Sequence, residues 1–138
     1  MNKLFEINEI DFYQEEFQDN IFEFEDIIPL IQDFQSEMKL EKIECVDLND
    51  CCGKTKTNFL AELVGVIDKE DNFYTINEAI ELLPLNIKDE FLRKLKKDEN
   101  SISLLEKLIK KTNGILVPFV IQIYKCLGCN KWIINIIE

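Results

Sequence analysis

The spacing of apolar and polar residues in the first part of the chain predicts strands separated by acidic stretches. Apolar positions partly alternate with polar ones over residues 3–10, and near period-2 character appears again over 21–25. The alternation is clear over 42–48, where the sequence K-I-E-C-V-D-L predicts a strand. The polar stretch that follows, residues 50–58, is typical of a loop.

Two hairpins are predicted further along the chain. An apolar run over 59–67 is followed by the turn-forming sequence D-K-E-D-N and then by Phe73 and Tyr74, which together predict a hairpin. The beginning of that run, residues 59–63, also fits a helical turn. Near the end of the chain, residues 116–124 and 132–137 are rich in β-branched side chains and flank a short polar stretch. We expect these two segments to pair as a terminal hairpin.

Helical spacing appears in the middle of the sequence. A helix is expected to begin near Pro29, with Asp26 available at its start. Its apolar face is predicted to carry Leu30, Ile31, Phe34 and Met38. Two more helices are predicted over 87–97 and 101–112.

A capping box marks the start of another helix. Thr75 and Glu78 are three residues apart, so each side chain can accept a hydrogen bond from the other residue's backbone amide. The helix should end at Leu82 or Leu83, because Pro84 disfavours helical backbone in the residue before it.

The order of these elements predicts the fold class. Strands dominate both ends and helices the middle, which is typical of an α+β fold with an antiparallel sheet, helices packed on one face and a C-terminal β-hairpin. The chain has 138 residues, of which 46% are hydrophobic, and only four Gly and three Pro. That length and composition predict a single domain over residues 1–138.

Composition also narrows the function. The chain has no histidine, which removes the commonest general base and the commonest metal ligand, and it has no phosphate-binding glycine loop or nucleophile elbow. We therefore expect a binding protein and no enzyme. Five cysteines and the lack of a signal-peptide pattern favour the cytoplasm, and no apolar run approaches the roughly 20 residues that span a bilayer.

Cys126 and Cys129 carry the most specific local chemistry. They stand two residues apart in Y-K-C-L-G-C-N-K-W, at the tip of the predicted terminal hairpin, where Gly128 and Asn130 permit a tight turn. Two thiolates in this arrangement can bind one metal ion. Residues 124–132 resemble half of a zinc-ribbon site, and the resemblance implies a structural zinc ion. The alternative is that Cys126 and Cys129 are free thiols near a turn and that the protein has no cofactor.

A tetrahedral zinc site needs two more ligands, and the sequence leaves their identity open. Cys51 and Cys52 precede a Gly-Lys pair as in a second knuckle, although Asn49 stands where the zinc-ribbon pattern has a cysteine. Cys45 with Cys51, or a cysteine with a carboxylate such as Asp50, are the alternatives. A thiol redox role is disfavoured, because the residues after Cys129 resemble a strand and redox Cys-x-x-Cys motifs open a helix.

Charge is distributed very unevenly along the sequence. The first 50 residues contain 15 acidic side chains and three lysines, a net charge of −12, whereas the whole chain has a net charge of −11. Such a field accelerates the approach of a cationic partner and opposes contact with nucleic acid or an anionic membrane. Aromatic side chains alternate with the acids over residues 15–26, which we call the acidic segment. The predicted partner-binding residues are Glu15, Glu16, Phe17, Asp19, Phe22, Glu23, Phe24, Glu25 and Asp26.

In size, acidity and expected cytosolic location, the whole chain resembles immunity proteins of bacterial polymorphic toxin systems, including those of contact-dependent inhibition. The resemblance implies an antitoxin that blocks a basic partner protein, most plausibly a toxin nuclease domain. Two other functions stay open: a small zinc-ribbon-like regulatory or adaptor protein, and a phage-encoded inhibitor that mimics DNA. The sequence does not specify an oligomeric state.

Overall fold

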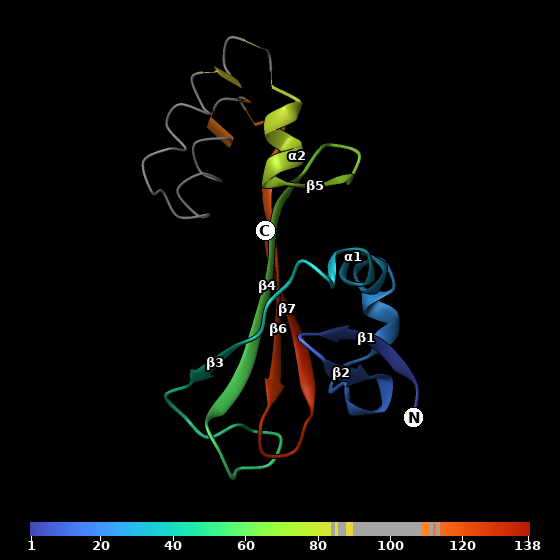
Figure 1. The fold of residues 1–138 in the computed structure, drawn as a ribbon, viewed down its shortest axis with the longest axis vertical. Helices are drawn as coiled ribbons and strands as arrows, with labels where there is room; N and C mark the ends of the chain where they lie inside the picture. The colour runs from blue at the N-terminus through green and yellow to red at the C-terminus, as the bar shows by residue number, and fades with distance from the viewer. Residues whose placement is uncertain (84, 86–87, 90–108, 111, 113) are drawn as a thin grey trace. The chain divides into compact units, whose positions relative to one another are not determined.

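The computed structural model describes residues 1–83, 85, 88–89, 109–110, 112 and 114–138 (Figure 1). It is an α+β protein with a two-stranded sheet, β1–β2, and a five-stranded sheet in the order β3-β4-β6-β7, with β5 paired to β4. The elements are β1 (Lys3–Ile7), β2 (Ile10–Tyr13), the 3-10 helices η1 (Gln14–Glu16) and η2 (Ile21–Phe24), α1 (Ile27–Phe34), β3 (Glu41–Glu44), β4 (Thr57–Ile67), β5 (Phe73–Thr75), α2 (Ile76–Glu81), β6 (Val117–Cys126) and β7 (Trp132–Ile137). None of the helices in these residues is long and apolar enough to cross a membrane.

The chain forms two compact units, and the first contains residues 1–63 and 121–135. Its N-terminal hairpin pairs β1 with β2 through a two-residue turn at Asn8 and Glu9, both of which have positive φ angles. The core beneath is aromatic. Phe5 stacks on Phe12 with ring centroids 4.8 Å apart, and both rings meet Trp132 edge-on at 5.2 and 5.4 Å. Such edge-to-face contacts add to the stabilisation that burial of each ring provides.

The second unit contains residues 64–120 and 136–138. Its described core includes Val66, Ala79, Ile80, Leu83 and Leu116. The predicted capping box opens α2: the Glu78 amide donates to the Thr75 hydroxyl at 3.2 Å, and the Thr75 amide donates to Glu78 Oε1 at 3.1 Å. Two backbone donors that the helix leaves unpaired are thus satisfied by neighbouring side chains.

The structure confirms the predicted α+β class, the hairpin that joins β4 to β5, the capping box and the C-terminal hairpin formed by β6 and β7. The predicted first helix exists but begins at Ile27. Helix α2 ends at Glu81, slightly before the predicted end. The predicted helices over 87–97 and 101–112 lie almost entirely outside the described residues. The prediction of a single domain stays a prediction.

The sequence pattern of the first 50 residues was an incomplete guide to the structure at three places. The near period-2 pattern over 21–25 belongs to the 3-10 helix η2, whose amide at Phe22 is capped by the Asn20 side chain. The strand predicted over 42–48 is shorter, because regular pairing with β4 ends at Glu44. Strand β2 was not predicted; it is only four residues long and stands at the start of an acid-rich stretch.

Candidate metal centre

The loop between β3 and β4 presents two adjacent cysteines on a single turn. The Gly53 amide donates to the Asn49 carbonyl at 2.8 Å, which closes one turn around Cys51 and Cys52. Gly53 ends this turn in the left-handed region, with φ of +62°, where a side chain would add strain. The Asn49 amide also donates to the Thr55 carbonyl at 2.8 Å. These bonds fix the loop from which both sulfurs project.

The tip of the β6–β7 hairpin presents the other two cysteines. The Cys126 amide donates to the Lys131 carbonyl at 2.9 Å, and the Asn130 amide donates back to the Cys126 carbonyl at 3.0 Å. Asn130 has a φ of +66°, which asparagine tolerates better than most residues. Gly128 fits a close approach, because a Cβ there would lie 3.0 Å from Thr55 Cγ2 and 3.1 Å from Cys52 Sγ and would crowd both side chains.

Sheet order brings these two loops together. Strand β4 is the neighbour of β6, and their antiparallel arrangement places the start of β4 beside the end of β6. The Leu127 amide donates to the Thr57 carbonyl at 3.2 Å and joins the hairpin tip to the start of β4. The loop before β4 and the loop after β6 therefore meet at one end of the sheet.

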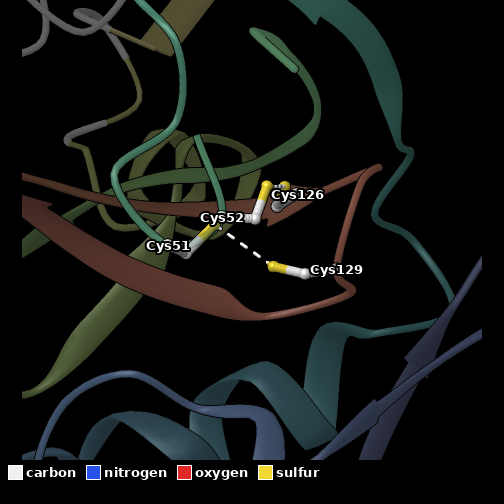
Figure 2. A group of neighbouring side chains, drawn as sticks. All are labelled: Cys51, Cys52, Cys126 and Cys129. Atoms are coloured by element: carbon white, nitrogen blue, oxygen red, sulfur yellow. Dashed lines mark hydrogen bonds between the residues drawn. The ribbon is translucent and has the colours of Figure 1, made fainter. Parts of the chain in front are cut away.

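The sulfurs of Cys51, Cys52, Cys126 and Cys129 all lie within 4.8 Å of one another (Figure 2). The Sγ atoms of Cys51 and Cys129 are 3.2 Å apart, and those of Cys52 and Cys126 are 3.6 Å apart. These are the four residues that the sequence analysis favoured as metal ligands. The alternative ligands, Cys45 and Asp50, are not members of this group in the described part of the chain.

Hydrogen-bond donors around Cys126 favour its thiolate form. Asn49 Nδ2 donates to Cys126 Sγ at 3.1 Å, and the Gly128 amide donates to the same sulfur at 3.3 Å. The Asn49 side chain is itself held by Asn58, whose Nδ2 donates to Asn49 Oδ1 at 2.9 Å. Asn58 is 6% exposed, so this support is buried. Groups that orient a ligand in this way are a regular part of metal sites.

The local environment shifts the pKa values of Cys126 and Cys51 in opposite directions. Burial alone would raise the pKa of Cys126, but the hydrogen bonds from Asn49 and from the Cys129 and Gly128 amides outweigh burial and lower it to about 6. Burial, followed by hydrogen bonding with Cys129 and Cys126, raises the pKa of Cys51. Four thiolates this close repel one another unless a cation lies between them.

The sulfur positions fit a tetrahedral zinc ion. With zinc–sulfur bonds of about 2.3 Å, tetrahedral ligands stand about 3.8 Å apart. The Cys52–Cys126 pair, at 3.6 Å, lies close to that spacing, the Cys51–Cys129 pair is shorter at 3.2 Å, and the widest separation in the group does not exceed 4.8 Å. A cavity of about 180 Å³, lined by Cys51, Cys126 and polar side chains such as Gln18 and Lys131, lies against the sulfurs. It gives an ion room to approach them.

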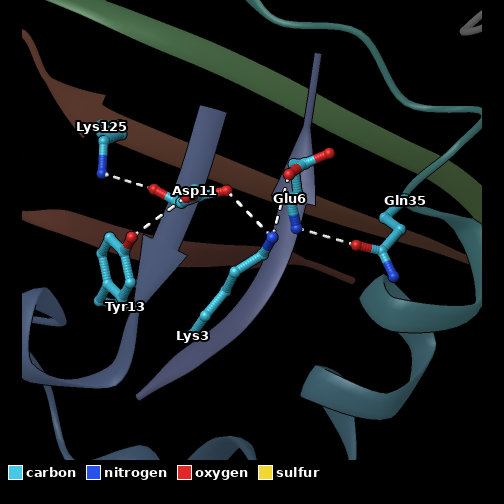
Figure 3. Close-up of polar contacts among 6 residues, drawn as sticks. All are labelled: Lys3, Glu6, Asp11, Tyr13, Gln35 and Lys125. Carbon is cyan, nitrogen blue, oxygen red and sulfur yellow. Dashed lines mark hydrogen bonds and ion pairs between the residues drawn. The ribbon is translucent and has the colours of Figure 1, made fainter. Parts of the chain in front are cut away.

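The first two residues of the acidic segment have partners inside the protein. Both carboxylate oxygens of Glu15 accept hydrogen bonds from the Asn2 amide, at 2.8 and 3.0 Å, and this contact lowers the pKa of Glu15. Glu16 forms an ion pair with Lys125 at 4.0 Å. Just before the segment, Asp11 pairs with Lys3 at 3.2 Å (Figure 3). Some of the negative charge is therefore balanced internally.

The rest of the acidic segment divides into an inner and an outer set. The inner set is aromatic: the Phe17 ring packs on Trp132 at 4.5 Å and on Phe24 at 5.4 Å. The outer set is exposed and consists of Asp19, Phe22, Glu23, Glu25 and Asp26, with Phe22 76% exposed. No ion pair joins these four acids to a basic side chain in the part of the chain that the structure describes. The predicted binding residues thus do not all face one surface.

Sequence reasoning missed Asn49, Lys125 and Trp132. Asn49 was noted only as a departure from the zinc-ribbon pattern, but its side chain donates a hydrogen bond to the Cys126 sulfur. Lys125 and Trp132 flank the hairpin tip and are 5% and 0% exposed. A lysine and a tryptophan beside a Cys-x-x-Cys pair were the available signal.

Comparison with known proteins found no matching family model, curated protein or solved structure.

Proposed function

We propose that the protein is a zinc-stabilised binding module and has no catalytic role of its own. The observation that carries the metal assignment is the convergence of four cysteine sulfurs within 4.8 Å from two separate loops. An all-sulfur tetrahedral set favours zinc among the common biological cations. Because four protein ligands complete the coordination, no position is left for substrate or activated water. The ion would therefore act as a structural clamp between the two loops.

Metal analysis tests this assignment directly. Protein purified without added metal should contain one zinc per chain, and X-ray absorption should find four sulfur neighbours at about 2.3 Å. Protein purified under reducing conditions that takes up no zinc when the ion is supplied would contradict the proposal. A first shell made mainly of oxygen or nitrogen would also contradict it.

A second proposal concerns the partner of this module. The exposed acids Asp19, Glu23, Glu25 and Asp26, together with exposed Phe22, favour a basic protein surface as the partner. Carboxylates attract such a surface over a distance, and an aromatic ring can anchor the contact. The function that fits best is that of an immunity protein which blocks a basic toxin domain.

Association kinetics with a partner captured from the native cell test this second proposal. Neutralising the outer acids (Asp19→Asn, Glu23→Gln, Glu25→Gln, Asp26→Asn) should slow association about tenfold at low salt and flatten its salt dependence. The control removes the same charge elsewhere on exposed positions (Asp33→Asn, Glu37→Gln, Glu41→Gln, Glu44→Gln). Equal slowing by both variants would indicate that only net charge matters and would exclude the acidic segment as the contact surface.

A further inference from the structure

Lys125 connects the metal-binding hairpin to the residues that lead into the acidic segment. It immediately precedes Cys126 at the end of β6, and it is 5% exposed. Its Nζ donates to the Asp11 carbonyl at 3.1 Å (Figure 3). The same Nζ lies 4.0 Å from Glu16 Oε1 and 4.8 Å from the centre of the Phe12 ring. Each of these contacts ties one side chain of the hairpin to residues 11–16.

Trp132 makes the corresponding connection on the other side of the hairpin tip. It begins β7, three residues after Cys129, and it is fully buried. Its Nε1 donates to the Tyr13 carbonyl at 2.8 Å, and its own carbonyl accepts from the Gln18 amide at 3.1 Å. Its ring packs on Phe17 at 4.5 Å. Together, Lys125 and Trp132 anchor the stretch of residues 11–18 from both strands of the hairpin.

The metal ion would decide how firmly these anchors are held. Positions 126–129 form a tight turn whose sulfurs meet the loop between β3 and β4, and a bound ion would lock the two together. Without the ion the turn keeps only a few hydrogen bonds at the end of a sheet, where local opening costs little. Opening of the turn displaces both anchors, because Lys125 immediately precedes it and only Asn130 and Lys131 separate it from Trp132.

We propose that metal binding at the four cysteines orders residues 11–18 through Lys125 and Trp132 and so prepares the acidic segment for its partner. This inference rests on the proposed zinc site and adds a regulatory consequence to it. Metal-loaded protein presents the segment in one conformation, whereas metal-free protein loses affinity for the same partner. Linkage requires the converse as well, so a bound partner tightens metal binding.

Hydrogen exchange and the single tryptophan provide the readouts. The zinc-loaded protein is compared with the same protein after chelation and after zinc is restored. Chelation should speed amide exchange over residues 11–18 and shift Trp132 emission to longer wavelength, and zinc should reverse both changes. Residues 73–81, which belong to the second unit, should keep their protection. Equal loss of protection there would indicate global unfolding and overturn the specific coupling.

A pair of lysine variants separates the anchor from the metal site. Lys125→Met removes the bonds to Asp11 and Glu16 but keeps the apolar stem of the side chain. It should retain one zinc per chain while exchange over residues 11–18 accelerates about tenfold, the factor expected when one charged hydrogen bond is lost. The matched control is Lys42→Met, at an exposed position on β3 in the same unit, which should behave like the wild-type protein.

The outcomes of these experiments distinguish the metal site itself from its proposed coupling to residues 11–18. Protein that binds no zinc overturns both the metal site and the coupling. Protein that binds one zinc but whose exchange over residues 11–18 ignores chelation overturns the coupling alone. The coupling is also overturned if Lys125→Met and Lys42→Met exchange at the same rate.

Discussion

The four-cysteine cluster and the acidic segment lie in the same compact unit, yet their residues are arranged in opposite ways. The cysteines come from two loops 74 or more residues apart in sequence, and their sulfurs converge on one point. The acidic segment is continuous in sequence, and its side chains diverge. Glu15 and Glu16 bind to the protein itself, Phe17 and Phe24 pack inward, and the remaining members face outward.

This contrast shows which kind of pattern localises a function. Each cysteine has a chemistry that requires the others, since one metal ion needs several thiolates at a fixed distance. The convergence of the four sulfurs is therefore evidence that they bind one ion together. A run of charged and aromatic residues has no such requirement, because each side chain can contribute separately to capping, packing or solubility. Only the outward-facing residues of the acidic segment still support a role in binding a partner.

The largest expected effect comes from removing one sulfur of the cluster. Cys126→Ser should abolish stoichiometric zinc binding and lower the free energy of unfolding by several kcal/mol, because structural zinc contributes on the order of 10 kcal/mol to the folding of small domains. Metal analysis and denaturant unfolding measure the two consequences. Cys45→Ser is the matched control, because Cys45 lies outside the cluster and its Sγ accepts a hydrogen bond from Asn58 Nδ2 at 3.4 Å.

Together, the two cysteine variants test whether the four-cysteine cluster is the metal site. If Cys45→Ser loses zinc while Cys126→Ser keeps it, the ligand set is different and the convergence of the four sulfurs has another cause. If both variants keep zinc and full stability, the cluster holds no structural ion. Loss confined to Cys126→Ser supports the cluster as the metal centre.

Much of the fold was predictable because strands that are buried on one face keep a regular alternation. The terminal hairpin and the β4–β5 hairpin follow from such patterns and from the turn residues between them. The pattern of residues 21–25 did not identify their structure, because near alternation over only five residues also fits a turn of 3-10 helix. Strand β2 is only four residues long, and its partner β1 determines its position more than its own sequence does.

The metal site was predictable only where it depends on local spacing in the sequence. The spacing of Cys126 and Cys129 is local, so the sequence indicates that both sulfurs can point at one ion. The choice of Cys51 and Cys52 over Cys45 depends on β4 lying beside β6, which is a long-range property of the sheet. The contact of Asn49 with Cys126 depends on that arrangement too. No local pattern contains this information.

An inward member of the acidic segment should give the next largest effect. Phe17→Ala should lower the free energy of unfolding by about 2–3 kcal/mol, since the half-buried ring is lost from contacts with Trp132 and Phe24. Trp132 emission should also shift, because its nearest ring neighbour is removed. Thermal or denaturant unfolding measures the first effect and fluorescence the second. Wild-type stability would mean that the ring is not packed there in solution.

The smallest expected effect sharpens the division between inward and outward members. The Phe22 ring is 76% exposed, so Phe22→Ala should change the free energy of unfolding by no more than about 0.5 kcal/mol and leave Trp132 emission unchanged. Its consequence should appear only with the partner, as faster dissociation, because an aromatic anchor acts after the charges have brought the two surfaces together. Denaturant unfolding beside dissociation kinetics separates these effects. Destabilisation comparable to that of Phe17→Ala would show that Phe22 belongs to the core, and the outer surface of the acidic segment would then lack an apolar anchor.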